Sequence, residues 1–220
     1  NAGPIYDESG KLIAVVETLR DMTVQKQAQT ELQRLATRDG LTGVANRRCF
    51  DSVLEAEWKR RVRDLKPLSM ILIDVDHFKN YNDSFGHQSG DVCLKAIAST
   101  MVSSCLRSSD LIARYGGEEF AAILPSTTAS GSLTVAERIR ADIAALNLPH
   151  PANEGLGRVS VSLGIATVQP DRALEIDELI AAADRALYAA KHGGRNRFVH
   201  AEQLEAEPFA ATTSAQARAA

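Results

Sequence analysis

The sequence is poor in the features that mark secreted, membrane-spanning and metal-clustering proteins. Its 220 residues contain only three cysteines, and these lack metal-ligand spacing. An odd number of separated thiols favours a reducing compartment, so we expect a cytoplasmic chain with buried thiols. No apolar run approaches the roughly 20 residues that span a membrane, and no signal peptide is visible. We therefore expect no membrane contact within this sequence.

An excess of positive charge is also lacking. The formal net charge is -3 and the isoelectric point is near 6.0, whereas a general nucleic-acid binder needs a basic surface. We therefore expect no nucleic-acid partner. With 45% hydrophobic residues, the chain has enough apolar material for one good-sized domain with appendages. It does not begin with Met, so we expect a piece of a longer protein, either soluble or the cytoplasmic part of a membrane-anchored sensor.

The two ends of the chain are poorly suited to folding alone. Residues 4–23 predict a turn centred on Asp7–Gly10 and then a strand rich in β-branched residues. So short a segment cannot form its own core, and we expect residues 1–23 to be the last hairpin of another domain. Residues 201–220 are rich in Ala and Glu without a clear apolar face, which predicts a flexible tail.

Residues 24–37 predict a polar helix with one narrow apolar stripe. The stripe consists of Val24, Ala28, Leu32 and Leu35. So narrow a stripe suits a partner helix better than a core. A solvated connector is the alternative interpretation.

Helices and strands alternate through the rest of the chain. We expect helices over residues 46–64, 91–106, 132–146 and 176–192, and strands over 68–75, 157–168 and 195–200, with a hairpin over 111–124. Because that hairpin has a two-residue turn, the sheet cannot be wholly parallel. The pattern predicts an α+β fold with a mixed, largely antiparallel central sheet flanked by helices.

Consecutive acidic residues occupy the tip of the expected hairpin, in "ARYGGEEFAAILP". With Gly116–Gly117 as the turn, Glu118 and Glu119 open the return strand with side chains on opposite faces. A turn needs the glycines but not the carboxylates. We therefore expect something to neutralise these two carboxylates.

Two more acids end the apolar run Leu68–Ile73. Asp74 and Asp76 lie at positions i and i+2, on the same face of the expected strand. Paired aspartates are stable there only if protonated, paired with cations or bound to a metal. If the hairpin lies beside this strand, a glutamate joins them and forms a set of hard oxygen ligands suited to Mg²⁺ and phosphoryl or nucleotidyl transfer. The alternative is a group of solvent-exposed loop acids.

The segment between these acids and the next helix is rich in Asn, Asp, Ser and Gly. We expect Phe78–Gly90 to be a polar loop that leads into a helix at Asp91. Asn82 and Asp91 can read a guanine edge, since a carboxylate accepts from N1–H and the 2-amino group. Both residue types are also common in turns and helix caps. Lys191 and Arg195 can clamp phosphates, although a cation also suits a helix C-terminus.

Five motifs together resemble the GGDEF-domain diguanylate cyclases. They are "DGLTGVANRR", "LIDVDHFKNYNDSFGHQSGD", "GGEEF", "SLGIA" and "ADRALYAAKHGGRNR", in family order over roughly residues 37–199. The third letter of "GGEEF" differs from the family name but keeps the carboxylate. The resemblance implies a palm-like domain similar to nucleotide cyclases and polymerases. It also implies a homodimer in which two GTP molecules, one per subunit, condense to cyclic di-GMP with release of pyrophosphate.

The resemblance also implies a role for each matching residue. The Mg²⁺ ligands, for which Mn²⁺ can substitute as the metal, would be Asp74, the backbone carbonyl of Val75 and Glu118, with Asp76 close by. Glu118 would also accept the proton of the 3′-hydroxyl, with Glu119 in support. The substrate-binding positions would be Phe78, Lys79, Asn82, Asp91, Gly116, Gly117, Lys191 and Arg195.

A further set of residues resembles the family's inhibitory site. "RSSD", from Arg107 to Asp110, would bind cyclic di-GMP as an allosteric inhibitor, with Arg138 as a second contact. By composition alone, Arg107 and Asp110 could be an ion pair at the end of a helix. Upstream, residues 1–23 resemble the end of a PAS domain, 24–37 would be a signalling linker, and 38–200 the catalytic domain.

Two other functions remain open from the sequence. The first is a non-catalytic receptor that binds cyclic di-GMP through "RSSD" and signals by contact. The second is a related metal-dependent nucleotidyl cyclase with another base specificity. Incubation with ATP in place of GTP would separate that case from a diguanylate cyclase.

Overall fold

The computed structural model describes residues 2–17, 31–32, 34–105, 107–170 and 175–206. It divides into two compact units, Asn1–Ala36 and Thr37–Ala220. Among the described residues, no helix combines the length and apolar character needed to cross a membrane. The three cysteines are free thiols, of which Cys93 is buried and the other two are partly exposed.

The first unit contains the expected hairpin. Strands β1 (Ala2–Tyr6) and β2 (Leu12–Glu17) pair antiparallel. The Asp7 carboxylate accepts hydrogen bonds from the backbone N–H groups of Ser9 and Lys11, both at 2.9 Å, and so holds the turn. Of the helix expected over 24–37, residues 31–32 and 34–37 are helical. The other residues of that helix, and tail residues 207–220, lie outside the described part of the chain.

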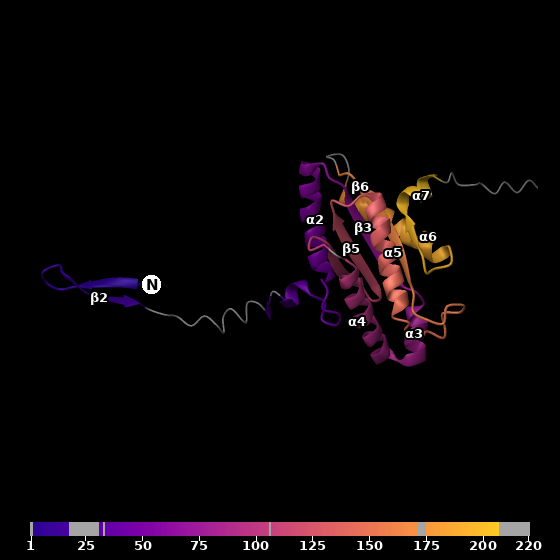
Figure 1. The fold of residues 1–220 in the computed structure, drawn as a ribbon, viewed down its shortest axis with the longest axis horizontal. Helices are drawn as coiled ribbons and strands as arrows, with labels where there is room; N and C mark the ends of the chain where they lie inside the picture. The colour runs from indigo at the N-terminus through magenta and orange to yellow at the C-terminus, as the bar shows by residue number, and fades with distance from the viewer. Residues whose placement is uncertain (1, 18–30, 33, 106, 171–174, 207–220) are drawn as a thin grey trace, which may run out of the picture. The chain divides into compact units, whose positions relative to one another are not determined.

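The second unit is built on a five-stranded sheet (Figure 1). Its order is β4 (Leu111–Gly116), β5 (Glu119–Pro125), β3 (Leu68–Val75), β6 (Val161–Val168) and β7 (Phe198–His200). Every neighbouring pair is antiparallel except β6 and β7, which are parallel. The predicted α+β class with a mixed, largely antiparallel sheet is therefore confirmed.

Helices cover both faces of this sheet. Helices α4 (His87–Ser104) and α5 (Ala129–Ala145) pack on one face together with α3 (Phe78–Phe85), against Ile71 and Ile73. Helices α2 (Arg47–Asp64) and α6 (Ile176–His192) pack on the other, against Met70 and Leu72. Strand β3 reads as a continuous apolar run because both of its faces are buried.

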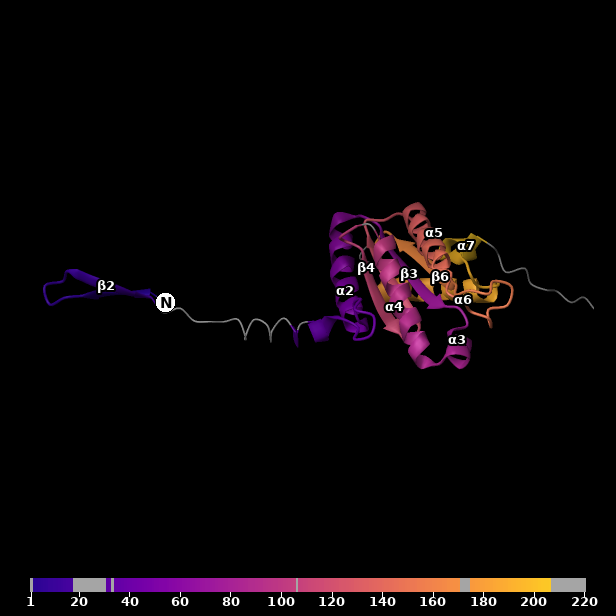
Figure 2. The same ribbon diagram turned by 60° about the horizontal axis from the view of Figure 1, so that its bottom comes forward.

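The structure corrects the loop expected over Phe78–Gly90. This segment forms α3 and the first turn of α4, separated only by Gly86, whose φ of 81° ends one helix and starts the next. Its Asn, Asp and Ser content suggested a loop, but Phe78, Tyr81 and Phe85 recur at helical spacing, and the first two are buried. Helix α3 lies at one end of the sheet beside the start of α4 (Figure 2).

Two smaller differences concern a turn and the C-terminal residues. Gly116 pairs with Glu119, so the two-residue turn of the hairpin is Gly117–Glu118, one residue later than expected. The first residues of the expected flexible tail form helix α7 (Ala201–Ala206). There the Gln203 side chain accepts a hydrogen bond from the backbone N–H of His200, at 3.0 Å.

Helix α6 packs closely on the sheet at Gly164 of β6. A Cβ atom at Gly164 would lie 2.1 Å from the backbone N of Leu187 and 2.2 Å from the carbonyl oxygen of Ala183, both in α6. These are backbone atoms, so α6 could move aside only as a whole.

We therefore expect Gly164→Ala to lower the free energy of unfolding by roughly 3 kcal/mol, the upper end of typical overpacking costs. Urea denaturation of the purified chain measures the change. Gly40→Ala is the matched control, because a Cβ at Gly40 meets no atom within 4 Å. A Gly164→Ala variant as stable as the parent would contradict the close packing of β6 on α6.

Candidate functional site

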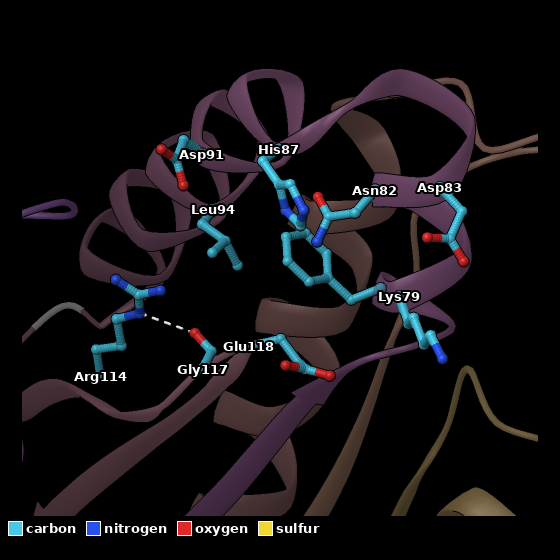
Figure 3. A pocket seen from close by; sticks show the side chains of 10 residues that line it. Lys79, Asn82, Asp83, His87, Asp91, Leu94, Arg114, Gly117 and Glu118 are labelled. Carbon is cyan, nitrogen blue, oxygen red and sulfur yellow. Dashed lines mark hydrogen bonds between the residues drawn. The ribbon is translucent and has the colours of Figure 1, made fainter.

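A cavity of about 590 Å³ lies where the hairpin turn meets helices α3 and α4 (Figure 3). It is lined by Phe78, Lys79, Asn82, Asp83, His87, Asp91, Leu94, Arg114, Gly117 and Glu118. Six of these are site residues predicted from the sequence, and they come from two helices and the hairpin. The fold therefore gathers into one cavity residues that are up to 40 positions apart in the sequence.

The hairpin turn is held beside the end of β3, as expected. Glu119 pairs with Asp74 in the β5–β3 register, and the backbone N–H of Val75 donates to the carbonyl of Glu118 at 3.4 Å. Glu118 is half-buried at the cavity, whereas Glu119 is exposed. The strand pairing therefore brings Glu118 next to Asp74 and Val75.

A lysine neutralises Asp74. Lys191, in the last turn of α6, places its Nζ 2.7 Å from Asp74 Oδ2. Burial raises the pKa of the Asp74 carboxyl above its usual value, and the charges of Glu118 and Glu119 add to this, while the Lys191 ammonium acts in the opposite direction. A positively charged group is therefore favoured beside the Asp74 carboxylate.

The donors at this point suit a hard cation. Asp74 and Glu118 carry carboxylate oxygens and Val75 carries a backbone carbonyl, which are the ligand types that Mg²⁺ prefers. Over the described residues, no group of three or more His, Cys, Asp or Glu side chains is arranged to hold a metal. A metal here would therefore take its remaining ligands from a substrate or from water.

Asp76 does not join this group. It is 1% exposed, and its carboxylate accepts hydrogen bonds from the hydroxyls of Ser160 and Ser162, each at 2.6 Å. It also accepts one from the backbone N–H of Asn196, at 3.0 Å. Both oxygens are engaged, so these contacts do not support the metal-binding role expected for Asp76.

Asn82 carries an unusual buried acceptor. Its Oδ1 atom is buried and has no hydrogen-bond partner within the described part of the chain, although the residue lines the cavity. A Cβ atom at Gly90 of α4 would lie 1.9 Å from this oxygen. The amide therefore lies over a glycine that leaves room for it, while Asp91, the next residue of α4, also lines the cavity (Figure 3). A buried acceptor left without a donor is costly.

The predicted phosphate-binding cations differ in their position relative to the cavity. Lys79 lines the cavity, whereas Lys191 does not line it and is paired with Asp74. Arg195 is exposed on the turn after α6 and does not line the cavity in this structure. Gly116 ends β4 just before the turn.

Arg114 is a site residue that the sequence reasoning missed. Its Nε donates to the carbonyl of Gly117 at 2.9 Å (Figure 3), and its Nη1 lies 3.2 Å from Asp39 Oδ1. Burial opposes ionisation of Asp39, but hydrogen bonds from Thr42 and the charge of Arg114 hold its pKa below the usual value. Arg114 thus braces the hairpin turn. The available signal was a charged residue inside an otherwise apolar strand.

A second cavity, of about 250 Å³, contains all three residues predicted for the inhibitory site. Arg107, Asp110 and Arg138 line it together with Thr127, Gly131, Thr134 and Val135. Arg107 Nη1 donates to Thr127 Oγ1 at 3.2 Å, and Arg138 Nε is buried without a partner. Burial raises the pKa of Asp110, while the charges of Arg107 and Arg138 oppose this shift. This cavity offers two guanidinium groups and a carboxylate to a ligand.

Comparisons with known proteins agree on one family. The family model described as "Diguanylate cyclase, GGDEF domain" matches residues 36–197. The chain is 40% identical over 200 residues to diguanylate cyclase DgcM of Escherichia coli K12, covering 91% of this chain and 46% of that protein. It is 42% identical over 193 residues to diguanylate cyclase DgcP of Pseudomonas aeruginosa, covering 86% and 28%. The chain thus spans less than half the length of these curated relatives.

A solved structure of a GGDEF domain is also similar to this chain. The coiled coil and GGDEF domain of DgcB from Caulobacter crescentus, in complex with c-di-GMP, superimposes with a TM-score of 0.74. The sequence identity is 35%, and the match covers 82% of this chain and 93% of that one.

Proposed function

The chain belongs to the GGDEF family of diguanylate cyclase domains, and on this premise we propose that it condenses two GTP molecules into cyclic di-GMP and two pyrophosphates. The observation that carries the proposal is the Asn82 amide, which lines one cavity together with Asp91 and Glu118 and whose Oδ1 has no hydrogen-bond partner among the described residues. A guanine supplies donors to both side chains through its N1–H and 2-amino groups, whereas the adenine Watson–Crick edge has only one donor group. Glu118 lies where the reacting groups of the same nucleotide would then be.

Each residue of the site has a role in the proposed reaction. Asp74, the Val75 carbonyl and Glu118 would hold Mg²⁺ or Mn²⁺, which supplies charge stabilisation for the phosphate oxygens. Glu118 takes the proton from the attacking 3′-hydroxyl, with the exposed Glu119 in support. Lys191, which is paired with Asp74 in the structure, would be free to bind the phosphates when Asp74 holds the metal. Lys79 and Arg195 add further positive charge, and Phe78 lies in the wall of the base site.

The stoichiometry of the reaction requires a second subunit. Each cavity accepts one nucleotide, and each 3′-hydroxyl must attack the α-phosphate of the other GTP with pyrophosphate as the leaving group. We therefore infer a homodimer with two such cavities face to face. Residues 24–37 would align the two subunits as a linker helix, and residues 1–23 would be the end of a PAS sensor domain.

The second cavity supports regulation by the product. Cyclic di-GMP carries guanine edges and phosphates, which match the Arg107 and Arg138 guanidinium groups and the Asp110 carboxylate. Arg138 lines this cavity beside Arg107, so both guanidinium groups face the space that such a ligand would occupy. The same observation fits a non-catalytic receptor for cyclic di-GMP, which is the second candidate function.

We expect the purified chain to convert GTP with Mg²⁺ to cyclic di-GMP, identified by mass spectrometry, and to form no such product from ATP. Glu118→Gln should lose about 10²-fold in rate or more, because it removes both a metal ligand and the base. The exposed Glu55→Gln in α2 is the matched control and should keep the parent rate. A dimeric parent that binds cyclic di-GMP but makes none would favour the receptor.

Gly90→Ala should impair guanine recognition while leaving the fold intact. The new methyl group overlaps the end of the flexible Asn82 side chain and lies 3.1 Å from Phe78 Cζ, a contact that a shift of a few tenths of an ångström relieves, and Ala favours the helix. We expect kcat/KM for GTP to fall about tenfold, the equivalent of one lost hydrogen bond. The preference for GTP over ITP, which lacks the 2-amino group, should shrink as well. Ser89→Ala, on the same helix, is the control. An unchanged GTP-to-ITP ratio in Gly90→Ala would contradict this role.

Arg107→Ala should relieve product inhibition. We expect the inhibition constant for cyclic di-GMP to rise about tenfold or more, since a charged hydrogen-bonding group is lost, with little change in the initial rate. Arg60→Ala, in an exposed pair on α2, serves as the control. Inhibition as strong as in the parent would show that the second cavity does not bind the product.

A further inference from the structure

The buried Asp76 carboxylate connects three separate segments of the chain. The hydroxyls of Ser160 and Ser162 donate to it from the start of β6 and the residue just before that strand, and the backbone N–H of Asn196 donates to it from the turn between α6 and β7. Three of its roughly four lone-pair positions are therefore occupied. A group so fully engaged is suited to holding a backbone segment in place.

The turn that Asp76 holds has an unfavourable backbone conformation. Arg195 and Asn196 have φ values of 60° and 46°, in the left-handed region that non-glycine residues rarely adopt. Such a conformation persists only where the surroundings impose it. At its start, the turn is fixed by the Arg195 N–H, which donates to the carbonyl of Ala190 at 3.1 Å. At its end, it is fixed by Asp76 and by Arg140 Nη1, 3.4 Å from Asn196 Oδ1.

The same segment carries two cations of the proposed phosphate site. Lys191 lies just before the turn and is paired with Asp74, and Arg195 lies within it. The two aspartates at the end of β3 therefore hold the two ends of one cationic segment. Asp74 contacts a side chain that can move to the phosphates, whereas Asp76 contacts a backbone N–H that cannot.

We propose that Asp76 is a positioning residue, which fixes the Gly193–Asn196 turn so that Arg195 can reach the phosphates of the bound nucleotide. This inference rests on the proposed function. It replaces the metal-ligand role with one that acts through the backbone of Asn196, and it makes the α6–β7 turn a part of the nucleotide site.

Asp76→Asn distinguishes positioning from metal binding. An amide of the same shape can keep all three contacts, because its oxygen accepts from Asn196 and Ser160 while its NH₂ donates to the Ser162 hydroxyl. The substitution removes the negative charge, which a metal ligand would need. Asp76→Ala removes the contacts as well. Asp74→Asn is the matched comparison for a carboxylate that does face the metal position.

The experiment measures binding of 3′-deoxy-GTP by isothermal titration calorimetry over a series of Mg²⁺ concentrations. This probe cannot react because it lacks the attacking hydroxyl. We expect Asp76→Ala and Arg195→Ala each to weaken binding about tenfold, and the double variant to weaken it little further, because both act on one contact. Asp76→Asn should bind within about threefold of the parent with the same Mg²⁺ dependence, whereas Asp74→Asn should need more Mg²⁺. Amide hydrogen exchange at residues 194–197 should be faster in Asp76→Ala without any nucleotide.

Three outcomes would overturn the inference. Asp76→Asn with the same altered Mg²⁺ dependence as Asp74→Asn would make Asp76 a metal ligand, and this comparison decides the matter even if Asp76→Ala does not fold. Fully additive losses in the double variant would show that Asp76 does not act through Arg195. A parent that does not bind 3′-deoxy-GTP at all would contradict the proposed function and this inference with it, whereas the first two outcomes leave the proposed function intact.

Discussion

The burial of β3 on all sides determines where the candidate site can lie. The strand is paired along both edges, by β5 and β6, and covered by helices on both faces. Polar side chains of this strand can therefore reach solvent only at its ends. Near one end, Asp74 of the strand lies beside the hairpin turn, and Lys191 of α6 pairs with it. The site is the place where the most buried strand of the fold reaches water.

Much of this arrangement is predictable from local sequence patterns. The apolar run of β3, the helical spacing in α2 and α6 and the glycines of the hairpin each indicate one element, and the five-stranded sheet follows from the alternation of helices and strands. Residues 78–90 show the limit of composition as a guide. Their Asn, Asp and Ser content is typical of a loop, but burial of Phe78 and Tyr81 against the core stabilises a helix there. Tertiary packing outweighed local preference.

The site residues were less predictable because their roles depend on contacts between distant segments. Spacing placed Asp74 and Asp76 on one face of a strand, yet Asp74 is paired with Lys191 and Asp76 is buried among serine hydroxyls. Nothing local to the strand distinguishes the two. Ser160, Ser162 and Asn196 decide the difference, and they lie more than 80 positions away. Arg114 escaped notice for the same reason, since its partner Asp39 is 75 positions upstream.

The hairpin turn leaves no room for a change of length. Its two residues are fixed by the β4–β5 register, by the contact between Val75 and Glu118, and by Arg114 on the carbonyl of Gly117. One inserted residue would turn Glu118 to the opposite face of the sheet or break those contacts, because side chains alternate along a strand. Insertions and deletions are thus excluded from this turn wherever the site is retained. Side-chain substitutions that keep a carboxylate at position 118 remain compatible with it. The hairpin turn can therefore vary in residue type but not in the number of its residues.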